Sequence, residues 1–251
     1  MFPTRPLPAL LCGFLLACSS PGSRVDTLVV VSDLDNPPFV RVDVASGRPA
    51  GRDVEMLKEV SERLGVQLDW RKMPFAELID AVESGDADLA CATLGISSER
   101  AERIRFSRPY FETEIAVVVR AGEGLTAPDQ LRTSKVYAGA GTTSQAAVLA
   151  QLPEAAGLFE AKEASTAELL LDGVVDAAVM DGPNADALVE GSEGLLERLP
   201  VDLNRERYAL AVDPSQDDLV RRIDGVLDDL EREGFLLLLD VSHGLVEFGT
   251  R

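Results

Sequence analysis

Histidine and cysteine are scarce in this chain of 251 residues, and their scarcity excludes several kinds of site. The single histidine, His243, cannot supply a histidine-ligated metal centre or a Ser-His-Asp relay, and we expect it to be structural. The three cysteines offer neither a disulfide framework nor a metal-binding spacing, and Cys91 lies alone in an apolar run as a small hydrophobic residue. We therefore predict no metal and no cofactor.

Positive charge is also in deficit. The chain has 24 Lys and Arg against 43 Asp and Glu, a net charge of −19. Such a surface repels nucleic acid and anionic lipid, so we predict no nucleic-acid partner. The acidity favours solubility first, and it also suits cationic or zwitterionic partners.

A long hydrophobic run is missing, because the apolar segment 6–17 is too short to span a membrane. It follows a cationic start at Arg5 and ends at Leu15-Leu16-Ala17-Cys18, which resembles a bacterial lipobox. We predict a lipoprotein signal peptide over residues 1–18 with Cys18 acylated, and a flexible tether over 19–26. The alternative is an ordinary signal peptide cleaved after a nearby small residue, with Cys18 incidental.

What the sequence does contain is an alternation of β-branched runs and amphipathic segments, which predicts α/β architecture with parallel strands and crossover helices. Asp53 is expected to cap the first helix, which ends at Gly65. A break after the apolar run 115–120 indicates a second unit. We predict lobe 1 over 27–119 and 208–251, and lobe 2 over 120–207. Strands are expected at 27–32, 66–70, 88–91, 115–120, 135–139, 175–180, 194–199 and 208–212. Helices are expected at 53–64, 74–85, 127–131, 144–152, 166–173, 182 onward and 216–233.

The segment 92–111 follows a predicted strand and has the composition of an anion site. Thr93, Gly95 and Ser97 leave backbone N–H groups accessible, and Arg100 stands close enough for its planar fork of donors to reach a carboxylate. The alternative makes Ser97 or Ser98 the N-cap of a short helix, with Arg100 on its solvated face.

A second anion-friendly turn, 139–144 (GAGTTS), opens a helix in the second unit. It lacks the lysine of a P-loop and the third glycine of a dinucleotide fingerprint. Further along, Asp181 ends a predicted strand, where a carboxylate could receive a cation. The alternative is a helix-capping aspartate.

Residues 27–240 together resemble family 3 of the bacterial periplasmic solute-binding proteins, the polar amino-acid binders of ABC importers. The resemblance lies in the order of five segments: VVVSDLDNPPF, GRDVEMLKEVSERLG, PFAELIDAVESGDADLACATLGISSERAERIRFSRPYF, VYAGAGTTS and GVVDAAVMD. It implies a periplasmic binding protein-like fold of type II, in which two doubly wound α/β lobes joined by a two-strand hinge close on a ligand.

The resemblance also implies roles at the ends of a zwitterionic ligand. Arg100 would bind the α-carboxylate, helped by the Gly95 N–H and by Thr143 of the opposite lobe. Asp181 would accept the α-ammonium, and the Thr93 hydroxyl would contact the same polar end.

For the ligand side chain, the resemblance implies that Phe75 packs against it and that Asp33 lies near its tip. Asn36 stands where many members have an aromatic residue. Gly95 replaces a frequent serine, and Arg52 replaces an apolar residue of the usual Gly-Phe-Asp segment.

The implied function is capture of a small zwitterion, a polar amino acid, by a monomeric, membrane-anchored protein that presents it to ABC permease and ATPase subunits. One alternative is a lyase resembling the cyclohexadienyl dehydratases, which needs a general acid such as Glu112 or Glu114 in the cleft. Another is a sensory lipoprotein without a transport role.

Overall fold

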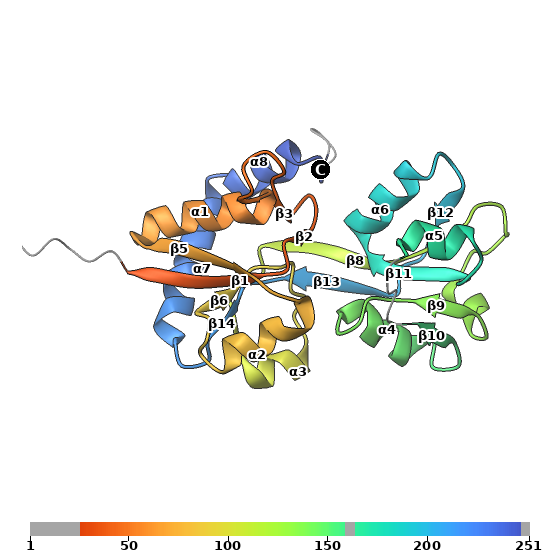
Figure 1. Cartoon of the computed structure of the whole chain (residues 1–251), viewed down its shortest axis with the longest axis horizontal. Coiled ribbons are helices and arrows are strands. Elements are labelled where there is room, and N and C mark those ends of the chain that lie inside the picture. Colours follow the sequence, from red (N-terminus) through yellow and green to blue (C-terminus); the bar gives the residue numbers. More distant parts are fainter. Residues whose placement is uncertain (1–25, 159–163, 247–251) are drawn as a thin grey trace, which may run out of the picture.

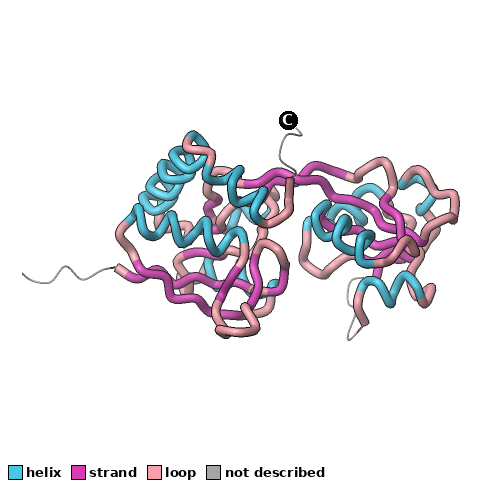
Figure 2. Tube along the Cα trace, turned by 90° about the horizontal axis from the view of Figure 1, so that it is seen from above, coloured by secondary structure: helices cyan, strands magenta, loops and turns pink. Residues whose placement is uncertain are grey.

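The computed structural model describes residues 26–158 and 164–246, so the predicted signal peptide and Cys18 lie outside the described residues. The chain forms two bodies side by side, connected in the middle by extended strands (Figures 1 and 2). Within the described residues, none of the helices combines the length and the apolar content needed to cross a membrane.

Lobe 1 is built around a five-stranded sheet with the order β5-β1-β6-β14-β7. The strands β5, β1 and β6 run parallel, whereas β14 is antiparallel to both of its neighbours. A small separate sheet has the order β2-β3-β4. The bounds are β1 Thr27–Ser32, β2 Asp35–Asn36, β3 Val40–Val42, β4 Pro49–Ala50, β5 Gln67–Lys72, β6 Leu89–Ala90, β7 Arg105–Phe106 and β14 Ala211–Val212.

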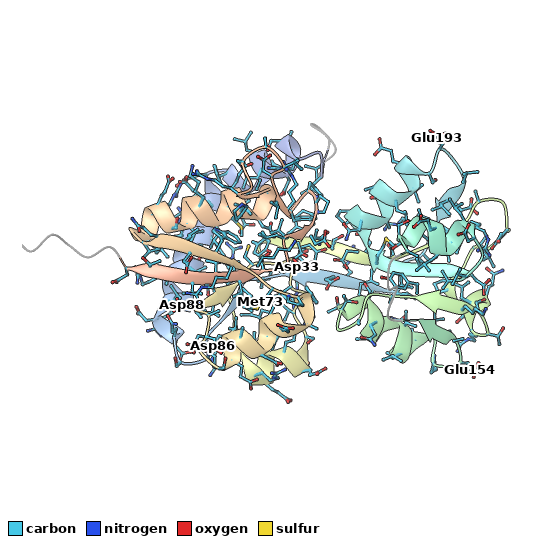
Figure 3. The ribbon with its side chains drawn as sticks, in the orientation of Figure 1. Asp33, Met73, Asp86, Asp88, Glu154 and Glu193 are labelled. Carbon is cyan, nitrogen blue, oxygen red and sulfur yellow. The ribbon has the colours of Figure 1, made fainter. Side chains whose placement is uncertain are left out.

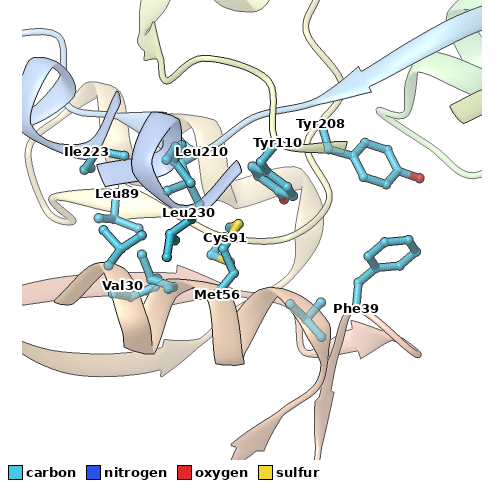
Figure 4. Packing of buried hydrophobic residues seen from close by; sticks show 14 of the residues in the cluster. Val30, Phe39, Met56, Leu89, Cys91, Tyr110, Tyr208, Leu210, Ile223 and Leu230 are labelled. Atoms are coloured by element: carbon cyan, nitrogen blue, oxygen red, sulfur yellow. The ribbon is translucent and has the colours of Figure 1, made fainter. Parts of the chain in front are cut away.

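Helices cover both faces of this sheet because successive strand residues point to opposite sides. Val30 packs with the apolar stripes of α1, α7 and α8, and Val31 packs with α2 on the other face. Figure 4 shows the first of these clusters, with Met56 of α1 next to Cys91 and with Val30, Ile223 and Leu230 nearby. The bounds are α1 Arg52–Leu64, the 3₁₀ helix η1 Phe75–Glu77, α2 Leu78–Glu83, α3 Ser98–Arg103, α7 Asp217–Arg232 and α8 Phe235–Ser242.

Lobe 2 has a six-stranded sheet with the order β10-β9-β11-β8-β12, and β13 pairs with the free part of β8. Val117 and Val119 pack toward α4, and Ala116 and Val118 pack toward α5 and α6. The bounds are β8 Phe111–Arg120, η2 Pro128–Leu131, β9 Lys135–Tyr137, α4 Thr143–Gln151, β10 Ala156–Leu158, α5 Thr166–Leu171, β11 Ala177–Asp181, α6 Gly182–Gly191, β12 Leu196–Arg198 and β13 Asn204–Tyr208.

The strands β8 and β13 carry the chain between the lobes as an antiparallel pair, with Phe111 opposite Tyr208 and Ile115 opposite Asn204. Residues 115–120 already pair with β11 and β12, and their side chains enter the core of lobe 2. The crossing therefore lies at residues 111–114. The predicted boundary between 119 and 120 is wrong, because the apolar run 115–120 is a central strand of lobe 2.

Several other element predictions need correction. The predicted strand 208–212 is two strands, since Tyr208 ends the crossing strand β13 and Ala211 begins β14 in the sheet of lobe 1. Asp53 does not cap α1. Gly51 occupies the N-cap position, and Asp53 is buried inside the first turn, where it accepts a hydrogen bond from the Tyr110 hydroxyl. The strands β2, β3, β4, β7 and β10, most of β13 and the helix α8 were not predicted.

Arg52, which had no role in the sequence analysis, is fully buried in lobe 1. Its guanidinium pairs with Asp53 at 3.2 Å and with Asp240 of α8 at 2.9 Å, and it donates to the Tyr110 carbonyl at 3.3 Å. Removing one partner of a buried ion pair costs about 3–5 kcal/mol of stability, because the other charge is left without compensation. This network fastens the last helix to the first helix beside the crossing strands.

Candidate ligand-binding site

A cleft of about 690 Å³ lies between the two lobes. Its walls come from the carboxyl ends of β1, β6 and β11, together with the first turn of α4, which is where open α/β sheets place their ligands. The structure brings all the predicted ligand-binding residues to this cleft: Asp33, Asn36, Phe75, Thr93, Gly95, Arg100, Thr143 and Asp181.

Arg100 extends from α3 in lobe 1 and contacts both lobes. Its guanidinium donates to the Gly95 carbonyl at 2.7 Å and to the Gly141 carbonyl of lobe 2 at 2.9 Å. Burial lowers the pKa of Arg100 from its usual value, since the cation has lost much of its hydration. The guanidinium has more N–H donors than these two bonds use. Arg100 is thus a partly desolvated cation with donors left for a ligand.

The helix cap that was weighed against the anion site is also present. The Ser97 hydroxyl accepts the backbone N–H of Arg100 and forms the N-cap of α3. The anion site and the helix cap would exclude each other only if Arg100 faced solvent. Its side chain lines the cleft, so both are present. The cap orients the helix so that the arginine turns inward.

Thr93 and Asn36 form one corner of the lobe 1 wall. The Asn36 amide donates to the Thr93 hydroxyl oxygen at 2.6 Å, and the Thr93 hydroxyl donates to the Ala92 carbonyl at 2.7 Å. Thr93 has a positive φ of 49°, an uncommon conformation for a residue other than glycine. The turn that holds Thr93 in the cleft is therefore tightly specified by its neighbours.

Asp181 and Thr143 stand on the lobe 2 wall. Asp181 occupies the N-cap position of α6, yet its carboxylate makes no capping hydrogen bond. It accepts instead from the Tyr208 hydroxyl, and from the Ser144 hydroxyl at 3.5 Å. The capping alternative therefore does not account for this side chain. Thr143 begins α4, and its hydroxyl donates to Glu206.

Asp33 follows β1 at the side of lobe 1 that faces lobe 2 (Figure 3). Its Oδ1 atom is buried and has no hydrogen-bond partner among the described residues. Burial raises the pKa of Asp33, and the backbone N–H of Asp35 opposes this shift in part. Phe75 lines the same cleft, and the Arg100 guanidinium carbon is 5.6 Å from the Phe75 ring centroid. The cleft thus contains an aromatic ring, Phe75, and a carboxyl oxygen, Asp33 Oδ1, that accepts no hydrogen bond from the described residues.

Sequence reasoning missed Glu206 and Tyr208 of β13. Glu206 is only 5 % exposed, and burial together with the charge of Asp181 raises its pKa to about 8. Tyr208 lies in the lobe 1 core, and its hydroxyl points out of the apolar cluster (Figure 4) toward Asp181. The strand NRERY reads as mostly charged, so only the period-2 alternation of Glu206 and Tyr208 could have indicated an inward face.

Glu112 and Glu114, the general acids of the dehydratase alternative, do not line this cleft. They line a separate cavity of about 770 Å³, bounded by β8, α6 and α8. Glu114 is engaged by Arg198 at 2.5 Å. Neither residue is placed to protonate a ligand between the lobes.

Comparison with known proteins agrees with this geometry. Residues 28–240 match the model of the bacterial extracellular solute-binding proteins, family 3, and the chain belongs to this family.

Similar proteins include the ABC transporter glutamine-binding protein GlnH of Bacillus subtilis (strain 168), 27% identical over 88% of each chain. The probable ABC transporter arginine-binding protein ArtJ of Chlamydia trachomatis serovar D is 29% identical over 94% of each chain. Among solved structures, an ancestral arginine-binding protein bound to arginine has a TM-score of 0.78 and 28% identity, covering 86% of this chain and 97% of that one. All three are named as amino-acid-binding proteins.

The geometry around Gly95 yields a stability prediction. A Cβ at Gly95 would lie 1.8 Å from Glu206 Oε1 and 2.9 Å from Thr143 Cγ2. We expect Gly95→Ala to lower the free energy of unfolding by about 1–3 kcal/mol, as overpacking does. Urea unfolding of the purified protein measures this change.

The control is a double-mutant cycle with Glu206→Ala, which removes the carboxyl group that would clash. Because the two residues are in contact, we expect the double variant to be more stable than the sum of the single changes by about 1 kcal/mol or more. Additive effects would show that Glu206 does not occupy the space above Gly95.

Proposed function

We propose that this protein captures a polar amino acid in the cleft between its lobes and presents it to the permease and ATPase subunits of an ABC importer. The observation that carries this proposal is the position of Arg100 and Asp181, a guanidinium on one wall of the cleft and a carboxylate on the other. A zwitterion needs opposite charges on opposite walls, and burial strengthens each charge-assisted hydrogen bond. The named functions of the relatives agree with binding rather than catalysis.

In this proposal, the ligand carboxylate lies against Arg100, Gly95 and Thr143, and its ammonium lies against Asp181. The Thr143 side chain of lobe 2 lies next to Gly95 of lobe 1. A ligand held in this way touches both lobes at once, so its binding favours the arrangement in which they meet. A single chain supplies both walls, and we propose that it acts as a monomer.

The charge balance of the cleft favours a ligand with a cationic side chain. Arg100 can neutralise the ligand carboxylate, Asp181 the ammonium, and Asp33 remains as a half-buried acid whose Oδ1 lacks a donor. The Phe75 ring offers a surface for the aliphatic part of a long side chain. Arginine and lysine fit this combination better than a neutral side chain does.

A thermal-shift screen of the twenty amino acids tests the ligand class, because a ligand that binds only the folded protein raises its melting temperature. We expect the largest shift with arginine or lysine. Asp33→Asn should weaken arginine binding about 10- to 100-fold, the contribution of a hydrogen bond to a charged group, and should leave glutamine binding nearly unchanged. Asp69→Asn, on the exposed edge strand β5, is the matched control. The absence of a shift with every amino acid would contradict the proposed function.

Arg100→Ala tests the carboxylate site. We expect a loss of amino-acid affinity of about 30-fold or more by calorimetry, because the ligand carboxylate would be desolvated without a partner. Arg103→Ala is the control, since Arg103 lies on the same short helix but pairs with Asp80 and Glu83 outside the cleft. Equal affinities of the two variants would remove Arg100 from the binding site.

We also propose that the protein is exported and held at the membrane by a lipid on Cys18. The cationic start, the short apolar segment and the Leu-Ala-Cys ending support this proposal. Cys18→Ser should move the protein from the membrane fraction to the soluble fraction, and metabolic labelling with a fatty acid should be lost with it. Membrane association that survives the change would contradict the anchor.

A further inference from the structure

Glu206 is a buried carboxyl group at the centre of the molecule, in the strand that returns the chain to lobe 1. Its neighbours along β13, Arg205 and Arg207, are exposed, and the alternation turns Glu206 and Tyr208 inward. Glu206 is not part of the cleft lining, but its carboxyl group lies between two residues that are, Gly95 and Thr143. A residue in this position acts on a ligand only through the groups above it.

Those groups come from both lobes. Glu206 Oε1 accepts the hydroxyl of Thr143 from lobe 2 and lies directly over Gly95 of lobe 1. The neighbouring residue Ser144 donates to the Asp181 carboxylate, so the adjacent residues Thr143 and Ser144 hold the two carboxyl groups in the same region, where the charge of Asp181 acts on Glu206. Its other oxygen, Oε2, is buried and has no hydrogen-bond partner among the described residues.

The charges facing this carboxyl pair are unbalanced. The groups that face Glu206 come from three elements: Asp181 from β11, Tyr208 from β13 and Thr143 from α4. Arg100 of α3 is a cation that acts on Glu206, and it also faces Asp181 and Glu99. Two carboxylates that meet in a buried site cannot both ionise cheaply, so one of them retains a proton.

We propose that Glu206 holds a proton beside Asp181 when no ligand is bound, and that the ammonium group of an amino acid expels this proton on binding. The inference rests on the proposed function. The reaction balances as written: the ammonium keeps its own protons and donates hydrogen bonds to Asp181, and the O–H bond of the Glu206 carboxyl group breaks and releases H⁺ to the buffer. The ligand cation replaces the proton as the charge that compensates the pair.

Glu206 is a positioning residue in this scheme. Without a ligand, the protonated carboxyl group of Glu206 and the hydroxyl of Tyr208 together hold Asp181 in place. The bond from Thr143 keeps Glu206 pointed at the junction of the lobes. Ligand capture therefore depends on pH through a residue that the ligand does not need to touch.

Proton release is measured by calorimetric titration with L-arginine in buffers of different ionisation enthalpy at pH 7. We expect the wild-type protein to release close to one proton, since the pKa of Glu206 is raised to about 8. The release should fall toward zero by about pH 9, where the pair has already lost the proton. For the same reason, affinity should rise roughly tenfold per pH unit between pH 6 and 7 and level off above about pH 8.

Glu206→Gln is the decisive variant, because its amide can still donate to Asp181 but cannot release a proton. We expect no proton release and an affinity that is nearly constant from pH 6 to 8. His243→Gln is the control, since this histidine lies beside Glu55, away from the cleft. This variant should release the same number of protons as the wild type.

The outcomes separate the two proposals. Arginine binding without proton release in the wild type, or the same release in Glu206→Gln, would overturn the proton on Glu206 and leave the amino-acid-binding function standing. If the wild type binds neither arginine nor any other amino acid, both proposals fall. Should Glu206→Gln fold poorly, the pH dependence of the wild type and of His243→Gln still decides the question.

Discussion

The antiparallel pairing of β8 with β13 is the constraint on which the rest of the molecule depends. Each strand begins in one lobe and ends in the other, and their backbone hydrogen bonds hold the two sheets at a set separation. Because the carboxyl ends of the parallel strands of both lobes face this junction, loops that are distant in sequence meet there. The cleft, its charges and the buried carboxyl pair all follow from this arrangement.

The local patterns predicted most of the secondary structure because burial and periodicity are strong in these segments. The β-branched run Thr27–Ser32 is the central strand β1, and the apolar stripe before Gly65 is α1. The predicted site residues also meet in one cleft, although no local signal could show this. Arg100 and Asp181 are far apart in the chain, and only the order of segments typical of the family predicted that they would face each other.

The residues that sequence reasoning missed have roles that only tertiary structure defines. Arg52 looks like a solvated helix residue, but α8 brings Asp240 over it and buries the pair. Glu206 lies in a run of charged residues, and its burial depends on contacts with Gly95 and Thr143 of different lobes. The strand from 208 to 212 was predicted as one element because its apolar pattern continues across the point where the chain changes sheets.

The position of the connecting ribbon has a mechanical consequence. In a hinged body, points near the axis move little when the halves rotate, and points at the rim move far. Glu206 and Tyr208 belong to β13, one of the two strands that connect the lobes, so the position of Asp181 relative to them changes little when the lobes rotate. The hydrogen bond from Arg100 to the Gly141 carbonyl joins parts of the two lobes that lie farther from these strands, and it must break for the lobes to separate. The groups that recognise the ligand's ammonium thus lie close to the hinge, and the hydrogen bond that holds the two lobes together lies farther from it.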